Sequence, residues 1–252
     1  MKATFINLVS FLEASKSHEI FESFKKINCL TDVKDTELDC IKEISKAFLS
    51  VQTAESSKFS GYIIDACYKG VGSEEFDILR FSEGTIINIE LKSKMVDEDQ
   101  IKKQLKRHRF FLKSIDVNRD VRLFTYEAET KRIFELIDDE LKPQNFSDIL
   151  KKIPEDYLEK NLLSVLDYNS FIISPYSEPE RFFKSQYFLN NEQEYARNSL
   201  LKSTSNFVVL KGGPGTGKSL ILFDTAKEMS QDGKNILYVF CSRLEQNELE
   251  II

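Results

Sequence analysis

The chain has 252 residues, of which 41% are hydrophobic and 30% charged, and its formal net charge is −6. This composition is typical of a soluble globular protein with one large or two small domains. It excludes a membrane-spanning class, because no stretch approaches the roughly 20 apolar residues that cross a bilayer. The acidic balance does not favour a nucleic-acid binder, although a local basic face can be hidden in such a chain.

The N-terminal stretch, MKATFINLVSFLEASKS, predicts an amphipathic helix and not a signal peptide, because Asn7 and Glu13 interrupt its short apolar patch. Four scattered cysteines form no CxxC pair: Cys29, Cys40, Cys67 and Cys241. With only two His in the chain, a zinc site is not expected. Buried or free thiols in a cytoplasmic protein are expected instead.

The first domain is predicted to begin with a helix over residues 31–48, where apolar residues recur at helical spacing. Three strand-like runs joined by short Gly-containing links indicate a β-meander over 61–69, 75–81 and 85–94. A helix is expected over 97–115, and two more strands over 120–126 and 131–137. This order predicts an α/β domain with a mixed sheet flanked by helices, ending near residue 140.

The second half is predicted to open with a helix capped by Asn190 or Asn191. A buried strand (NFVVLKG, 206–212), a helix over 218–231 and a second buried strand (KNILYVFCS, 234–242) should follow. Strand, Gly-rich loop, helix and strand predict a βαβ unit of a parallel sheet. The expected domains are residues 1–140, a helical linker over 141–185 whose last part carries Pro175 and Pro179, and residues 186–252.

The predicted meander carries a group of residues suited to phosphodiester chemistry. Asp77 lies on the second strand, while Glu90 and Lys92 lie two residues apart on the third and share one face. Two neighbouring carboxylates repel each other unless a cation joins them, and oxygen ligands suit Mg²⁺ or Mn²⁺. A lysine beside the metal could orient a water and stabilise charge on a phosphate. Alternatively, these residues form only the polar face of a half-exposed sheet.

The pattern Asp-x(12)-Glu-x-Lys on a meander after a helix resembles the PD-(D/E)xK nuclease superfamily, although Phe76 stands where Pro is usual. QLKRHRFFL, from Gln104, is similar to an element of the RecB-like branch that has Tyr where this chain has His108. The resemblance implies a restriction-endonuclease-like domain in which Asp77 and Glu90 bind the metal, Lys92 acts on the water and Gln104 assists. It also implies an acid on the first helix, for which Glu43 is the first candidate and Glu37 the second.

The helix after the meander is rich in basic residues that could contact DNA phosphates: Lys102, Lys103, Lys106, Arg107, Arg109 and Lys113. A solvated helix face would have the same composition, and for charge runs that is the commoner outcome. Both interpretations stay open on the sequence.

The sequence GGPGTGKS fits the phosphate-loop pattern G-x-x-x-x-G-K-S from Gly212 to Ser219. Glycines let backbone amides turn toward a phosphate, Lys218 would reach the β and γ phosphates, and Ser219 would hold Mg²⁺. The residues expected to bind ATP in this loop are Gly212, Gly213, Gly215, Thr216, Gly217, Lys218 and Ser219.

FLNNEQEYARNSL, before the loop, resembles the adenine-reading element of superfamily 1 helicases, which makes Gln193 the expected base contact. The segment after the loop, ILYVFCSRLEQNEL, is similar to that family as well. A motor of this family also needs an acidic strand end, arginine fingers and a second RecA-like domain, all expected beyond Ile252. ATP hydrolysis by this chain alone is therefore not expected, and the chain is expected to be the N-terminal part of a nuclease–helicase or a naturally truncated one.

Together these features predict a metal-dependent DNA nuclease coupled to an ATP-binding, helicase-like segment, with DNA, ATP and no membrane as partners. The resemblance implies DNA repair or defence against phage as the setting. Further expected partners are a second copy of the chain, as a homo-oligomer, or a missing C-terminal helicase half. The alternatives are a DNA-binding module that senses nucleotide without cutting and a plain ATPase with an accessory domain.

Overall fold

The computed structural model describes residues 4–51, 55–68, 74–166, 173–183, 187 and 189–239. The chain divides into two compact units. The first unit comprises Met1–Tyr68 and Glu74–Leu166, and the second comprises Lys69–Ser73 and Asp167–Ile252. Residues 141–166, expected in a linker, therefore belong to the first unit, so the sequence placed the boundary too early.

A six-stranded mixed sheet forms the centre of the first unit, in the order β1-β2-β3-β4-β5-β6. Its strands are β1 (Tyr62–Tyr68), β2 (Glu74–Phe81), β3 (Thr85–Lys92), β4 (Asp120–Glu127), β5 (Arg132–Ile137) and β6 (Glu140–Gln144). Only β3 and β4 pair in parallel, because α4 (Glu98–Lys113) crosses between them, and the other neighbours are antiparallel. The expected mixed sheet with flanking helices is confirmed.

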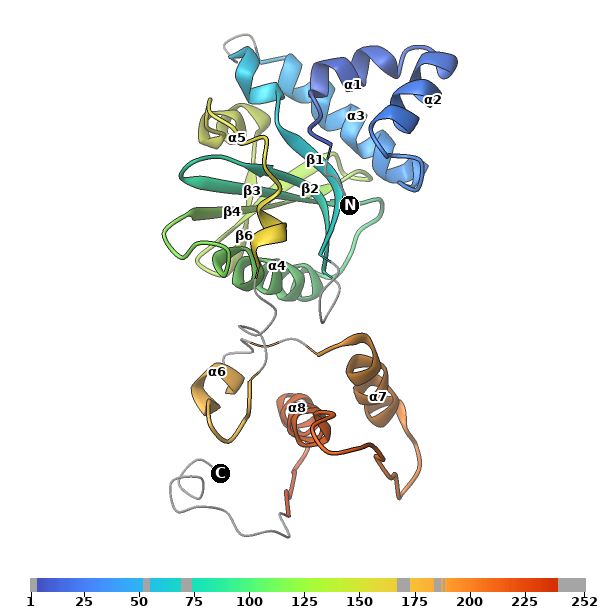
Figure 1. The fold of residues 1–252 in the computed structure, drawn as a ribbon, viewed down its shortest axis with the longest axis vertical. Helices are drawn as coiled ribbons and strands as arrows, with labels where there is room; N and C mark the ends of the chain where they lie inside the picture. The colour runs from blue at the N-terminus through green and yellow to red at the C-terminus, as the bar shows by residue number, and fades with distance from the viewer. Residues whose placement is uncertain are drawn as a thin grey trace. The chain divides into compact units, whose positions relative to one another are not determined.

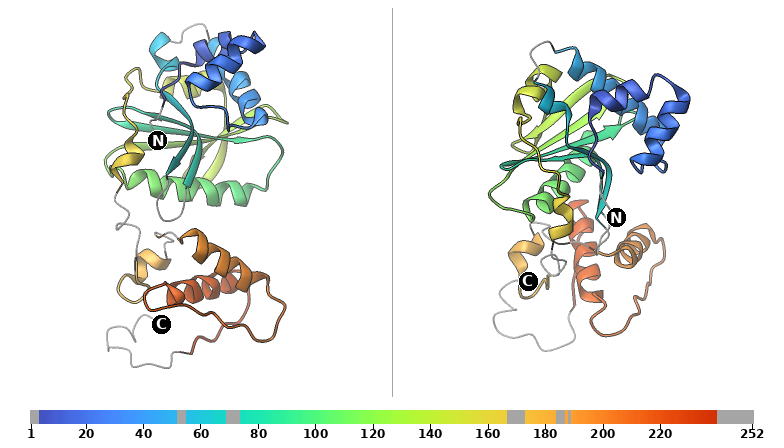
Figure 2. Two further views of the ribbon diagram at one scale, coloured as in Figure 1. Left: turned by 45° about the vertical axis from the view of Figure 1, so that its right-hand side comes forward. Right: turned by 45° about the horizontal axis from the view of Figure 1, so that its top comes forward.

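Helices cover both faces of this sheet (Figures 1 and 2). On one face lie α3 (Asp35–Leu49) and α5 (Phe146–Lys152), with α1 (Leu8–Ala14) and α2 (His18–Ile27) beside α3. Helix α4 lies on the other face. The unit also holds two 3₁₀ turns, η1 (Ser56–Phe59) and η2 (Leu162–Val165). The sequence analysis did not identify α2 or β6.

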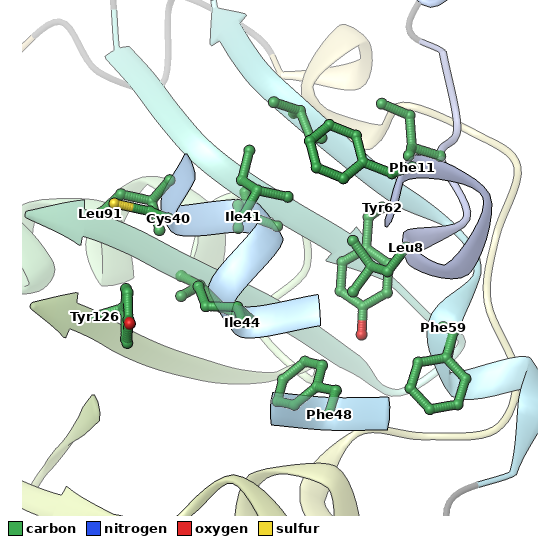
Figure 3. Close-up of a cluster of buried hydrophobic side chains, with 14 of the residues drawn as sticks. Leu8, Phe11, Cys40, Ile41, Ile44, Phe48, Phe59, Tyr62, Leu91 and Tyr126 are labelled. Atoms are coloured by element: carbon green, nitrogen blue, oxygen red, sulfur yellow. The ribbon is translucent and has the colours of Figure 1, made fainter. Parts of the chain in front are cut away.

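The main core lies between α3 and the sheet. Ile41, Ile44 and Phe48 recur at helical spacing on α3, and each is at most 1% exposed. Figure 3 shows these side chains over the strands that carry Leu91 and Tyr126. Acidic residues in the first turn of α3 stabilise the start of the helix through its dipole. The burial of this apolar stripe, at about 25 cal/mol per Å², provides the main driving force for packing α3 on the sheet.

A tight turn joins β5 to β6. Asp138 and Asp139 have φ of 51° and 64°, which is the left-handed pair that a two-residue hairpin turn needs. These two acids therefore form the turn of a hairpin, with Ile137 paired to Glu140. Strand β6 contains Pro143 and forms one edge of the sheet, where a residue without an N–H is tolerated.

The second unit contains α6 (Pro179–Phe183), α7 (Asn191–Lys202) and α8 (Lys218–Gln231). Asn190 caps α7, as one of the two predicted caps. The two buried strands expected before and after the Gly-rich loop (residues 212–219) are not formed in the described residues. Phe207 is 80% exposed and Leu237 is 87% exposed. A parallel strand buried on both faces requires strand neighbours and covering helices, and these segments have neither in the described part of the unit.

Residues 240–242 of the second expected strand, and Cys241 with them, lie outside the described residues. Cys29 and Cys40 form no disulfide. Within the described ranges, no helix has both the length and the apolar character to cross a membrane.

Gly61 provides a test of the packing of Tyr157 in the first unit. Its φ is +84°, and a Cβ there would lie 2.5 Å from the Tyr157 ring, whereas a Cβ on Gly84 would meet nothing within 4 Å. We expect Gly61→Ala to lower the free energy of unfolding by about 2 kcal/mol or more, since strain and overlap add. Gly84→Ala should stay within roughly 0.5 kcal/mol. Urea unfolding followed by circular dichroism measures both, and equal effects would contradict the packing of Tyr157 on Gly61.

Candidate functional site

The candidate site forms where β2 and β3 stop pairing. Their register runs from Phe81↔Ile86 to Ile78↔Ile89 and ends there, one residue before Asp77. The Asp77 carboxylate then takes the place of a strand carbonyl, since its Oδ2 accepts the Leu91 N–H at 2.7 Å. The end of the ladder therefore fixes Asp77 against β3, close to Glu90 on that strand.

Three of the predicted site residues form one chain of contacts on the α4 face of the sheet. Gln104 Nε2 donates to Glu90 Oε2 at 2.8 Å, and Lys92 Nζ donates to Gln104 Oε1 at 2.9 Å. Lys92 Nζ lies 4.0 Å from the same Glu90 oxygen. Gln104 thus uses both ends of its amide to hold two side chains of β3, Glu90 and Lys92, at fixed positions.

A buried histidine, which the sequence analysis noted only as a departure from a motif, completes this network. His108 is 1% exposed; its Nε2 lies 3.1 Å from Glu74 Oε1 and its Nδ1 lies 3.2 Å from Glu90 Oε1. Glu74 also accepts from Arg107 Nε at 2.8 Å. Burial alone would lower the pKa of His108, but the two carboxylates raise it to about 9, so the ring is an imidazolium at neutral pH.

The two acids of the site differ in their electrostatics. Burial raises the pKa of Asp77 to about 7, and the negative charge of Glu90 adds to the effect. Burial would also raise the pKa of Glu90, but the neighbouring His108 and Lys92 cations hold that pKa below its ordinary value. Glu90 is therefore the permanent carboxylate, and Asp77 is the one that an added cation would change most.

The structure separates the two acids considered on the first helix. Glu43 accepts from the Tyr126 hydroxyl at 2.7 Å and pairs with Lys131 at 3.4 Å. Glu37, two turns earlier on α3, is the helix acid whose charge contributes to the raised pKa of Asp77. The first choice, Glu43, is thus engaged elsewhere, because acids six residues apart on a helix occupy different turns.

The described residues contain no group of three or more His, Cys, Asp or Glu arranged to hold a metal. The predicted trio of Asp77, Glu90 and Glu43 therefore does not form. Asp77 and Glu90 remain as a pair, and Mg²⁺ is often bound by one or two carboxylates, with waters and substrate phosphates completing its shell.

The basic residues of α4 are mostly engaged within the protein. The ion pairs are Lys102–Glu140 (2.7 Å), Lys106–Asp139 (3.1 Å), Arg109–Asp139 (2.9 Å) and Arg107–Glu74 (2.8 Å). Lys113 donates to the carbonyls of Val117 and Arg119. A phosphate could contact most of these cations only by replacing an acidic partner.

The Gly-rich loop of the second unit runs directly into α8. Gly217 caps the helix with φ of 82°, in the left-handed region, and Lys218 is the first helical residue. Lys218 Nζ and Thr216 Oγ1 both donate to the Gly213 carbonyl, at 2.6 and 2.9 Å. Ser219 lies in the first turn, so the loop and the start of α8 bring together the residues expected to bind ATP.

Gln193 lies beside this loop, where its Nε2 donates to the Thr216 carbonyl at 3.1 Å. Phe182 stacks on Tyr187 with ring centroids 5.2 Å apart, and both belong to a small core with Ile173 and Leu189. Arg197 of α7 forms ion pairs with Asp224 and Glu228 of α8.

The raised pKa of Asp77 predicts that this side chain destabilises the fold when ionised. Its folded pKa of about 7 lies above the ordinary 3.8, so stability is lost as the pH rises through this range. We expect Asp77→Asn to raise the free energy of unfolding by about 1–3 kcal/mol at pH 8. At pH 4 the two proteins should be nearly equal, because Asp77 is then protonated. Thermal unfolding at both pH values measures this, and a less stable variant at pH 8 would contradict it.

The imidazolium of His108 predicts the opposite dependence at higher pH. Its folded pKa of about 9 exceeds the ordinary 6.5, so its stabilisation is complete below pH 6.5 and is lost as the pH rises through 9. Between pH 6.5 and pH 9.5 we expect the free energy of unfolding to fall by about 2–3 kcal/mol more in the wild type than in His108→Gln. Urea titrations at four pH values measure the difference, and parallel curves would count against a charged ring.

Residues 185–251 match the model of the family described as Nephrocystin 3, N-terminal. No curated protein and no solved structure matches the chain significantly.

This match corrects the family identification made from the sequence. The segment identified as the start of a superfamily 1 helicase is similar to Nephrocystin 3, N-terminal instead, and no family finding supports the PD-(D/E)xK nuclease superfamily for the first unit. The error has a physical origin. A strand, Gly-rich loop and helix serve phosphate binding in many families, so the motif reports a type of site and not a lineage.

Proposed function

We propose that the first unit hydrolyses phosphodiester bonds of DNA with a divalent metal ion held by Asp77 and Glu90. The observation that carries this proposal is a pair of mutually repelling carboxylates beside Lys92, the half-buried Asp77 and the buried Glu90. Burial of an unpaired carboxylate is costly, and the raised pKa of Asp77 records that cost. Groups perturbed in this way are concentrated at functional sites, where a ligand removes the repulsion.

The donor set suits Mg²⁺ or Mn²⁺. Glu90 Oε1 is buried and accepts no hydrogen bond, although His108 lies beside it. Glu90 Oε2 is held by Gln104, whereas Oε1 faces the His108 cation at 3.2 Å and would be shared between His108 and a metal ion. A bound divalent ion would polarise the phosphate and acidify a water.

Lys92 is assigned to the water and the phosphate. Its ammonium is held by Gln104 near Glu90, with a side chain that is 18% exposed, so it can reach substrate without leaving the network. A cation in that position stabilises the charge that develops on a phosphate under attack. Gln104 positions both Lys92 and Glu90 and carries no charge of its own.

A second activity, nucleotide binding, is proposed for the Gly-rich loop. The left-handed Gly217 and the start of α8 at Lys218 support it, because backbone amides at a helix N-terminus attract a phosphate anion. Lys218 would contact the β and γ phosphates, and Ser219 would contact the Mg²⁺ of ATP. We propose nucleotide binding here, without hydrolysis by this chain alone.

Cleavage of DNA by the full chain tests the first proposal. We expect residues 1–252 to cut linear or circular DNA in Mg²⁺ or Mn²⁺ without ATP, and to lose activity in EDTA. Lys92→Met should lower the rate by about 100-fold or more, since a group acting on the water contributes roughly 10²–10⁴. Gel assays on single- and double-stranded substrates, with RNA beside them, measure this rate.

Lys94→Met is the matched control, because Lys94 is exposed and lies two residues beyond Lys92. It should cut at the wild-type rate. Equal cleavage by wild type and Lys92→Met would contradict the role of Lys92. Metal-independent DNA binding with no cleavage by any variant would instead favour a DNA-binding module that senses nucleotide.

A further inference from the structure

Helix α7 begins with two reciprocal hydrogen bonds that involve Gln193. Asn190 Oδ1 accepts the Gln193 N–H at 2.8 Å, and Gln193 Oε1 accepts the Asn190 N–H at 2.9 Å. This capping box satisfies two backbone donors at the helix start and fixes the direction of the Gln193 side chain.

The other end of the same amide reaches the Gly-rich loop. Gln193 Nε2 donates to the Thr216 carbonyl at 3.1 Å. A Cβ built on Gly217 would lie only 2.3 Å from this nitrogen, so the amide rests directly against the loop backbone. Gln193 therefore joins two backbone segments that are 23 residues apart in sequence.

This arrangement differs from the one that reads a base. Bidentate recognition of adenine needs the carbonyl and the NH₂ of an amide turned together toward the base edge. Here the carbonyl is directed to the start of α7 and the NH₂ to Thr216. Each end of the amide thus forms a hydrogen bond with protein backbone, and the two ends are directed to different segments.

The Thr216 peptide is a sensitive point in the loop. Its neighbour Gly217 adopts φ of 82° immediately before α8, and Lys218 begins that helix. A restraint on the Thr216 carbonyl fixes the orientation of the following Gly217 N–H, because the two belong to one planar peptide. Holding such groups in place before a ligand arrives lowers the ordering cost of binding.

We infer that Gln193 is a positioning residue that fastens the phosphate loop to α7 and sets its affinity for the triphosphate of a nucleotide, without reading the base. This inference rests on the nucleotide binding proposed above. It predicts that the effect of losing Gln193 is independent of the base, and is the same for a ligand that has none.

Binding of Mg²⁺·ATP, Mg²⁺·GTP and Mg²⁺·tripolyphosphate to the full chain, measured by calorimetry, tests this inference. We expect Gln193→Met to weaken all three by the same factor, roughly three- to tenfold, as loss of the Thr216 hydrogen bond would. Asn190→Ala is the matched control. It breaks the other half of the capping box and leaves the Gln193–Thr216 bond intact, so its affinities should stay within about twofold of the wild type, since a lost cap acts on helix stability.

The other outcomes are distinguishable. Weaker ATP binding by Gln193→Met with unchanged tripolyphosphate binding would overturn the inference, because Gln193 would then read the base. Equal losses in Gln193→Met and Asn190→Ala would overturn it as well, since the effect would come from the start of α7. Unchanged affinities in Gln193→Met would also overturn the inference, because Gln193 would then have no influence on the loop's affinity for the triphosphate. Failure of the wild type to bind any of the three ligands would refute the proposed nucleotide site itself, and the inference with it.

Discussion

A buried imidazolium holds α4 against the sheet, and the geometry of the candidate site depends on it. His108 lies between Glu74 on β2 and Glu90 on β3, so one side chain sets the distance of the helix from two strands. Gln104 is four residues earlier and therefore shares its helix face, which places the Gln104 amide between Glu90 and Lys92. Removing one member of such a buried set leaves uncompensated charge, which is why the arrangement is rigid.

Two carboxylates of the same site thus have different environments. Glu90 is surrounded by cations and stays ionised, whereas Asp77 is half-buried and has the Leu91 N–H as its main compensation. An apolar core would be more stable than this pair. If a cation binds between these carboxylates, the arrangement has a physical reason. The fold is then less stable without the cation, and in return it contains a site that binds one.

The sequence predicted the strands of the first unit well, because alternation on β1 to β5 and the Gly-containing links are local signals. It could not identify β6, whose short run with Pro143 lacks alternation. It ranked Glu43 before Glu37, but both lie on α3, and only the packing of that helix decides which acid's charge acts on Asp77. The exposed segments at Phe207 and Leu237 show the opposite limit: an apolar run predicts a buried strand only when other strands are present to pair with it.

The β5–β6 hairpin gives the basic face of α4 an unusual property. Asp139 and Glu140 pair with Lys102, Lys106 and Arg109, so the helix carries its own fixed counterions. Binding of a polyanion normally gains free energy from the release of dissolved cations, and its affinity falls steeply with salt. A nucleic acid that reached α4 would instead displace two tethered carboxylates, which stay attached and compete at every salt concentration. The electrostatic selectivity of this surface would then depend on the hairpin's acids more than on the number of lysines.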